Sequence, residues 1–111
     1  MKLSFQEYEH ICVLTLSGEF TAEDSGLFTR VTGERLGAGA RHMLLDCEHL
    51  EFVDSSGIEH WLRLSEQVGR SSGQVRLVGL SDNIKKILEM TRHDRSFEAH
   101  TTVEAAVRSV R

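Results

Sequence analysis

The chain has 111 residues, of which 40% are hydrophobic and 27% are charged, a composition typical of a globular domain and not of a disordered or fibrous chain. We therefore expect a single domain over residues 1–111 with one hydrophobic core. The formal net charge is -4 and the Lys and Arg residues are scattered, which argues against a nucleic-acid partner because binding to a phosphate backbone needs a clustered basic surface.

The N-terminal segment MKLSFQEYEHICVLTLSGEF is interrupted by polar residues, among them Gln6, Glu7 and His10. It resembles neither the apolar region of a signal peptide nor a membrane span, so we expect a cytoplasmic protein without direct membrane insertion. Cys12 and Cys47 each lie in an apolar run, where a free thiol behaves as a small hydrophobic residue. We expect no disulfide in a reducing compartment.

Five strands are predicted in chain order. KLSFQEYE (2–9) and HICVLTLSGEF (10–20) indicate an opening β-hairpin, because the second segment alternates apolar and polar residues and ends at Ser17-Gly18. HMLLDC (42–47) and QVRLVGL (74–80) are short and apolar, which is typical of central strands buried on both faces. SFEAH (96–100) is predicted as an edge strand.

Four helices are predicted between and after these strands. Three of them begin with a Ser or Thr followed three residues later by an acid, which is the spacing of a capping box: Thr21 with Asp24, Ser56 with Glu59, and Thr101 with Glu104. The fourth covers DNIKKILEMTR (82–92). In the helix after Ser56 the inward positions are Ile58, Trp61, Leu62, Ser65 and Val68. Trp61 is expected to anchor the core.

The resulting order, β-β-α-β-α-β-α-β-α, predicts an α/β domain with a mixed, mostly parallel sheet opened by a hairpin and about four helices. Strands that alternate with helices of this length favour right-handed crossovers, which place the middle strands in parallel.

The stretch EFVDSSGIEH (51–60) raises the question of which serine is structural. The capping spacing assigns Ser56 to the helix start, where a hydroxyl contributes about 1 kcal/mol relative to Ala. Ser55 is then uncommitted, and we expect it to be the reactive or modifiable residue in a loop completed by Asp54 and Gly57. The alternative is that both serines serve only cap and turn chemistry.

In order along the chain, LTLSGEF, HMLLDCEHLEFVDSSGI, GQVRLVGLSDNIKKILEM and TTVEAAV resemble the STAS domain. This family includes bacterial anti-sigma-factor antagonists and the cytoplasmic tail of sulphate transporters. The resemblance implies that Ser55 is phosphorylated by a partner kinase that is also an anti-sigma factor, and that a serine phosphatase removes the phosphate. The chain departs from the family pattern at Ser81-Asp82, where proline is common, at Thr91-Arg92-His93, and at Glu59.

The resemblance thus implies an anti-sigma-factor antagonist of a partner-switching pathway, which captures the kinase until Ser55 is phosphorylated. A phosphate would add roughly -1.5 to -2 charges next to existing carboxylates, so it should change docking more than folding. The predicted partner-binding residues flank the serines or lie on the outward helix face: Glu51, Ile58, Glu59, Arg63 and Glu66. That face is equally consistent with a solvated surface carrying weak ion pairs.

Other functions are open or disfavoured. The alternatives are a subunit or regulator of a membrane transport system, or a small-molecule or nucleotide sensor. No enzyme activity, metal or cofactor is expected, because the histidines lack zinc-site spacing and neither a Gly-x-Ser-x-Gly elbow nor a phosphate-binding Gly-x4-Gly-Lys loop occurs. We expect a monomer or a weak dimer.

Overall fold

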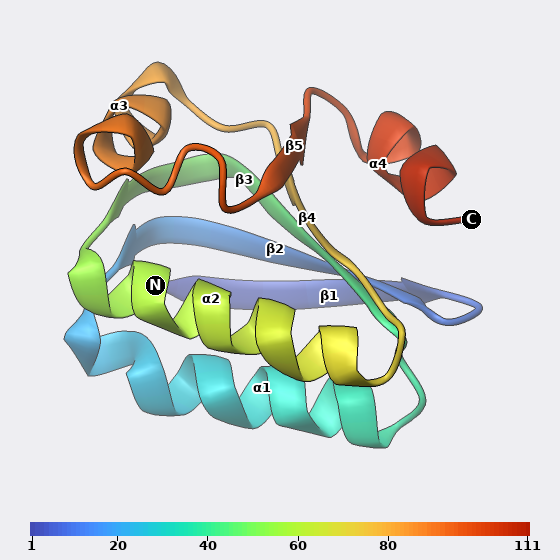
Figure 1. The fold of residues 1–111 in the computed structure, drawn as a ribbon. Helices are drawn as coiled ribbons and strands as arrows, with labels where there is room; N and C mark the ends of the chain where they lie inside the picture. The colour runs from blue at the N-terminus through green and yellow to red at the C-terminus, as the bar shows by residue number, and fades with distance from the viewer.

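A five-stranded sheet organises the chain in the computed structural model, which describes residues 1–111 (Figure 1). The elements in chain order are β1 (Lys2–Tyr8), β2 (Ile11–Phe20), the 3-10 helix η1 (Ala22–Asp24), α1 (Ser25–Gly37), β3 (His42–Val53), α2 (Ser55–Arg70), β4 (Val75–Val78), α3 (Asp82–Met90), β5 (Glu98–His100) and α4 (Val103–Val110). The strands lie in the order β1-β2-β3-β4-β5, with β1 antiparallel to β2 and the other pairs parallel. The predicted fold class is confirmed.

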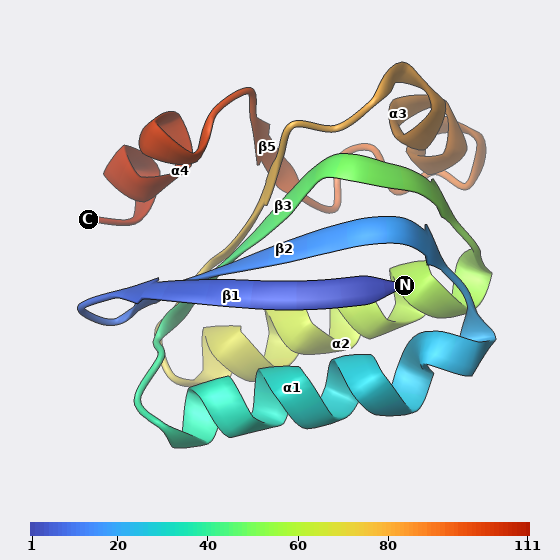
Figure 2. The same cartoon turned by 180° about the vertical axis from the view of Figure 1, so that it is seen from behind.

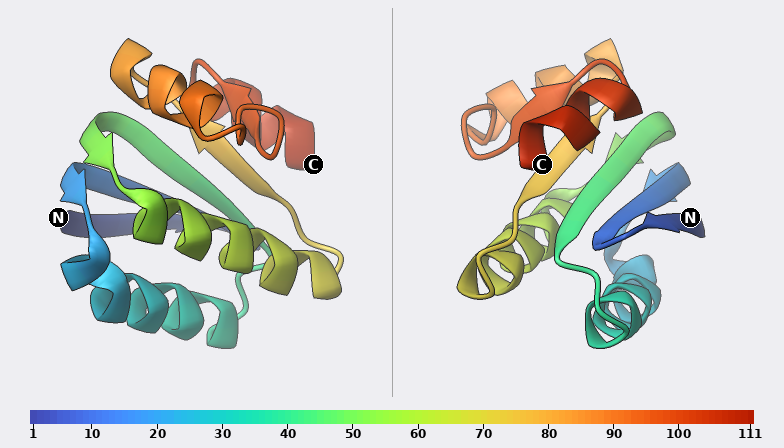
Figure 3. Two further views of the ribbon diagram at one scale, coloured as in Figure 1. Left: turned by 60° about the vertical axis from the view of Figure 1, so that its left-hand side comes forward. Right: turned by 90° about the vertical axis from the view of Figure 1, so that its right-hand side faces the viewer.

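The helices cover the two faces of the sheet unequally. Helices α1 and α2 lie side by side on one face, and α4 lies across the sheet from them (Figures 2 and 3). Buried side chains of α1, α2 and α3 share one cluster of 19 residues, whereas Ala106 and Val110 of α4 join Leu44 and Val78 in a second cluster of six. None of the helices combines the length and the apolar character that crossing a bilayer requires.

Strand β3 runs through the middle of the sheet. Met43, Leu44 and Leu45 are each fully buried, and alternate residues enter different clusters, so both faces of this strand are covered as predicted. The strand continues to Val53, beyond the predicted end at residue 47. Glu48 and His49 are both exposed and the register with β2 shifts here, which removes the two-residue periodicity while the pairing with β2 continues.

Of two helix starts predicted from capping spacing, one is confirmed and the other is displaced by one residue. Thr21 starts η1, and its backbone amide donates to the Asp24 carboxylate at 3.0 Å, as predicted. That hydrogen bond is the main reason why the pKa of Asp24 lies below its usual value. Thr101 does not cap α4; the Thr102 hydroxyl accepts from the Ala105 amide at 3.1 Å instead. Spacing alone does not separate two adjacent threonines.

The inward face of α2 is rotated slightly from the prediction. Ile58, Trp61 and Val68 are buried as predicted, but Leu64 completes the buried stripe, while Leu62 and Ser65 are only partly buried. The Trp61 indole is fully buried and meets the Phe97 ring edge-on at 6.0 Å between centroids, which confirms its role as a core anchor.

Cys12 and Cys47 are buried free thiols. Burial raises the pKa of Cys12 to about 11, with a smaller contribution from Glu7, and it also raises the pKa of Cys47. Both sulfur atoms therefore stay protonated and contribute to packing.

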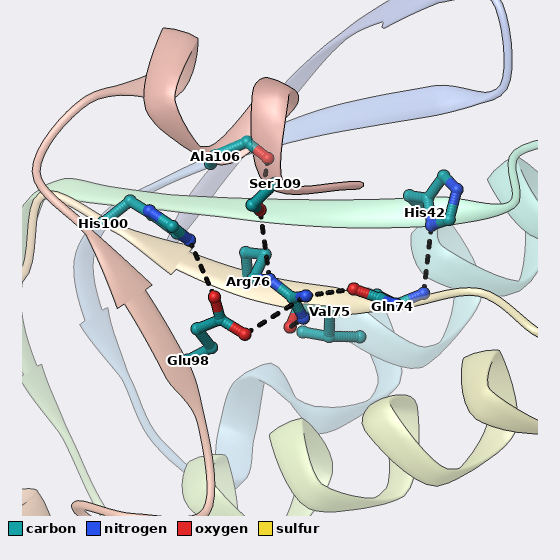
Figure 4. A network of polar contacts seen from close by, with 8 residues as sticks. All are labelled: His42, Gln74, Val75, Arg76, Glu98, His100, Ala106 and Ser109. Atoms are coloured by element: carbon teal, nitrogen blue, oxygen red, sulfur yellow. Dashed lines mark hydrogen bonds and ion pairs between the residues drawn. The ribbon is translucent and has the colours of Figure 1, made fainter. Parts of the chain in front are cut away.

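A polar network fastens α4 and β5 to β4 (Figure 4). The Arg76 guanidinium, only 13% exposed, donates from Nε to the Ser109 hydroxyl at 3.2 Å and lies 3.2 Å from the Glu98 carboxylate. It also donates to Gln74. On the neighbouring strand, Nδ1 of His42 accepts a hydrogen bond from the backbone amide of Gln74 at 3.1 Å.

The His42 contact predicts a pH dependence of stability. Burial is the largest cause of a lowered pKa for His42, followed by the positive charges of Arg41, Arg76 and His10. Because folding favours neutral His42, its stabilising contribution is complete above the usual histidine pKa of about 6.5 and is lost as pH falls through the lower folded-state value. We expect the denaturant concentration at the unfolding midpoint to decrease as the pH is lowered from 7.5 to 5.

In His42→Gln, whose side-chain oxygen can still accept from the Gln74 amide, the fall in denaturant midpoint should be smaller. His49→Gln, at an exposed position of the same strand, is the control and should keep the full effect. An unchanged pH profile in His42→Gln would remove His42 as the cause.

Candidate functional site

The two serines directly follow β3, at the end of the sheet where β2 and β3 stop and where η1 and α2 begin. Phe20 and Val53 are the last paired residues of these strands, and both are fully buried. The start of α3 is tied to the same region, because the Asn83 side-chain amide donates to the Glu51 carbonyl at 2.9 Å. Ser81, one of the departures from the family pattern, caps α3 by accepting from the Ile84 amide at 3.2 Å.

Asp54 is the N-cap of α2. Its backbone is extended, and its Oδ1 accepts a hydrogen bond from the Gly57 amide at 2.9 Å. The other oxygen, Oδ2, accepts from the Ala22 amide at 3.1 Å. One carboxylate therefore satisfies the starts of two helical segments that lie far apart in the sequence.

The prediction that Ser56 caps α2 is wrong. The helix begins at Ser55, so Ser56 is its second residue, and the Ser56 hydroxyl lies 3.4 Å from the Ser25 hydroxyl of α1. Glu59 lies 3.5 Å from Arg63 in an exposed ion pair instead of reaching back to the helix start. Asp54 and Gly57 have the same three-residue spacing, and a carboxylate offers two acceptor oxygens where a hydroxyl offers one atom.

Ser55 is exposed at the first position of α2, and its hydroxyl has no hydrogen-bond partner within the protein. Ser56 is partly buried beside α1. The two adjacent hydroxyls therefore differ in access, and that of Ser55 is the one available to another molecule.

Gly57 lets α2 approach the ends of the strands closely. A Cβ atom at this position would lie 2.6 Å from Cγ2 of Val53 and 3.1 Å from Cγ of Phe20, both in the fully buried core. Any larger residue here would push the start of α2 outward, and Ser55 with it.

The predicted partner-binding residues divide into two groups. Glu51, Glu59, Arg63 and Glu66 are exposed. Ile58 is only 2% exposed and belongs to the hydrophobic core, so its inclusion as a contact residue was wrong; its inward position on the helix was the better guide.

Sequence reasoning overlooked Phe52, whose side chain is 38% exposed at the end of β3. A signal was present, because Phe52 directly precedes the buried Val53, and successive residues of a strand point to opposite faces. The contact between the Ala22 amide and Asp54 was also overlooked, since nothing in the local sequence relates these two residues.

A large hollow lies away from the serines, and no metal site is formed. A hollow of about 700 Å³ lies where β3, β4 and β5 meet the start of α4, and its lining includes Asp46, Glu48, Lys85 and His100 but neither serine. No group of three or more His, Cys, Asp or Glu side chains is arranged to hold a metal ion.

Comparison with known proteins defines the family. The STAS domain family matches residues 2–106, nearly the whole chain. The chain belongs to the STAS domain family. A relative from Thermotoga maritima, whose name contains the term anti-sigma factor antagonist, is 24% identical over 104 residues, which cover 93% of this chain and 92% of that protein.

Solved structures with the same fold include a bacterial regulator and part of a membrane transporter. Unphosphorylated SpoIIAA, named an anti-sigma factor antagonist, matches with a TM-score of 0.82 at 20% identity over 99% of each chain. The phosphorylated form of this Bacillus protein matches at 0.74. The murine anion transporter Slc26a9 matches at 0.71 and 19% identity, over 92% of this chain and 18% of the transporter.

The cap geometry predicts a large loss of stability for one of two neighbouring variants and almost none for the other. Asp54→Ala removes the acceptor of both the Gly57 and Ala22 amides and should lower the free energy of unfolding by about 2 kcal/mol. Ser56→Ala removes only a long contact to Ser25 and should change it by less than about 0.5 kcal/mol. Urea unfolding followed by circular dichroism measures both; a larger loss for Ser56→Ala would contradict the assignment of Asp54 as the cap.

Proposed function

We propose that this STAS protein is an anti-sigma-factor antagonist of a partner-switching pathway. When unphosphorylated it binds a serine-kinase anti-sigma factor; phosphorylation of Ser55 by that kinase ends the binding, and a serine phosphatase reverses it. The observation that carries the proposal is the free, exposed hydroxyl of Ser55 directly after the capping Asp54. The names of the Thermotoga relative and of SpoIIAA support the same function.

The local geometry favours Ser55 as a substrate of another enzyme. No histidine or carboxylate accepts a hydrogen bond from its hydroxyl, so the activating base that a nucleophilic serine requires is missing. The protein is therefore proposed to be a non-enzymatic binding partner that acts in the cytoplasm, where its kinase has access to ATP.

A phosphate on Ser55 would be tolerated by the fold. It would lie at the start of α2, where the helix dipole favours negative charge. Both oxygens of the neighbouring Asp54 already accept hydrogen bonds from backbone amides, which limits the repulsion between the two groups. Phosphorylation should therefore leave the helix starts intact.

The same phosphate would disrupt docking. It brings roughly -1.5 to -2 charges to a surface on which Glu51 and Glu59 are already exposed. An interface fitted to a hydroxyl has no counter-charge directly opposite Ser55 for a dianion, and a loss of about 4 kcal/mol weakens binding about a thousandfold. Glu51, Glu59, Arg63 and Glu66 are proposed as the remaining partner contacts.

The structural match to Slc26a9 supports a second candidate function, a subunit or regulator of a membrane transport system that uses the same surface without phosphorylation. Copurification with transporter components from detergent extracts, equal for the wild type and for Ser55→Ala, would favour this candidate.

Phosphorylation of a single serine tests the proposal. The protein is coexpressed with each serine-kinase anti-sigma factor of its own organism and analysed by intact mass and peptide mapping. We expect one phosphate in the wild type and in Ser56→Ala and none in Ser55→Ala, because of the two adjacent hydroxyls that of Ser55 is the exposed and unpaired one. Phosphate on Ser56, or no phosphate with any of these kinases, would contradict the proposal.

A further inference from the structure

Phe52 is an exposed aromatic residue next to the switch serine. It lies opposite Glu19 of β2 in the parallel register, and the following pair, Phe20 and Val53, is fully buried in the cluster that includes α1 and α2. Because successive residues of a strand point to opposite faces, Phe52 and Glu19 point away from the core. Nothing in the fold covers the phenyl ring completely, since 38% of the residue remains exposed.

Two acidic residues adjoin Phe52: Glu19 is its partner in β2, and Glu51 precedes it in β3. Glu19 and Glu51 are both exposed, and neither takes part in an ion pair within the protein. Ser55 follows three residues later, a separation that spans at most about 11 Å between Cα atoms. An interface of ordinary size, about 800 Å² on each partner, covers both positions.

We propose that Phe52, with Glu19 and Glu51 around it, is the anchor by which the Ser55 kinase holds this protein. The inference rests on the proposed function and adds the chemistry of the partner: an apolar pocket for the phenyl ring, rimmed by Lys or Arg side chains. Buried aromatic anchors surrounded by polar contacts dominate the binding energy of protein interfaces. Opposite charges on the two rims fix the orientation of docking and accelerate it.

The anchor also acts as a positioning group for phosphoryl transfer. The loop after Phe52 is held by the two hydrogen bonds of Asp54, so a seated phenyl ring sets the place of the Ser55 hydroxyl relative to the γ-phosphate of ATP. The basic rim is engaged by Glu19 and Glu51. After transfer, the phosphoserine faces the phosphates of ADP rather than that rim, and the kinase releases the protein.

The test uses the kinase that phosphorylates Ser55, with affinity measured by calorimetry and phosphorylation by steady-state kinetics. Phe52→Ser should weaken binding roughly 30-fold, raise KM and also lower kcat because the Ser55 hydroxyl loses its positioning, while Phe52→Leu should restore most of the affinity. Tyr8→Ser is the matched control, because Tyr8 is 52% exposed at the opposite end of the sheet, and this variant should bind like the wild type.

Glu19→Gln combined with Glu51→Gln should reduce the salt dependence of the dissociation constant. Melting temperatures of all the variants close to that of the wild type would exclude unfolding as the cause of any loss of affinity.

Each other outcome overturns a defined part of the account. Wild-type affinity in Phe52→Ser, with phosphorylation of Ser55 intact, overturns this inference and leaves the proposed function standing. Self-association that disappears in Phe52→Ser would assign the patch to a second copy of the chain and also overturn it. If no serine-kinase anti-sigma factor of the organism binds the wild type, the proposed function fails and the inference fails with it.

Discussion

The geometry around Ser55 depends on the hydrogen bonds of the Asp54 carboxylate. Its two oxygens accept hydrogen bonds from the Gly57 amide of α2 and the Ala22 amide of η1, at 2.9 and 3.1 Å. The amide of the same residue donates to the Phe20 carbonyl at the end of β2. A single residue thus joins two strand ends and two helix starts, and amides at helix starts otherwise lack partners. The position of Ser55 follows directly from this anchoring.

This arrangement leaves the Ser55 hydroxyl without a role in the fold. Gly57 brings α2 against Val53 and Phe20, Asp54 caps the helix, and Ser56 turns toward Ser25, so none of these roles needs the Ser55 hydroxyl. A modification of Ser55 can therefore alter the charge of the surface without removing a contact that stabilises the fold. Phe52, on the other side of the Asp54 anchor, is exposed close to the same hydroxyl, which is why it is proposed as the partner's anchor.

The element order and fold class could be predicted because apolar periodicity reports burial, and burial decides most of this structure. The residue that caps α2 could not be predicted, since Asp54 and Ser56 are both good caps. Asp54 also binds the Ala22 amide, 32 positions away, and the local sequence does not show this contact. The length of β3 was missed where a register shift interrupts its periodicity. Ile58 illustrates the opposite error: its helical position already indicated the core, and proximity to the serines suggested a contact.

The most direct test compares amide NMR spectra and hydrogen exchange of the protein with and without phosphoserine incorporated at position 55 during translation, which requires no kinase. The account predicts chemical-shift changes confined to residues near Ser55 and the start of η1, with the Gly57 amide as protected from exchange as before. Loss of that protection, or shifts spread through the sheet and α4, would show that phosphorylation acts by altering the fold, and would contradict the account.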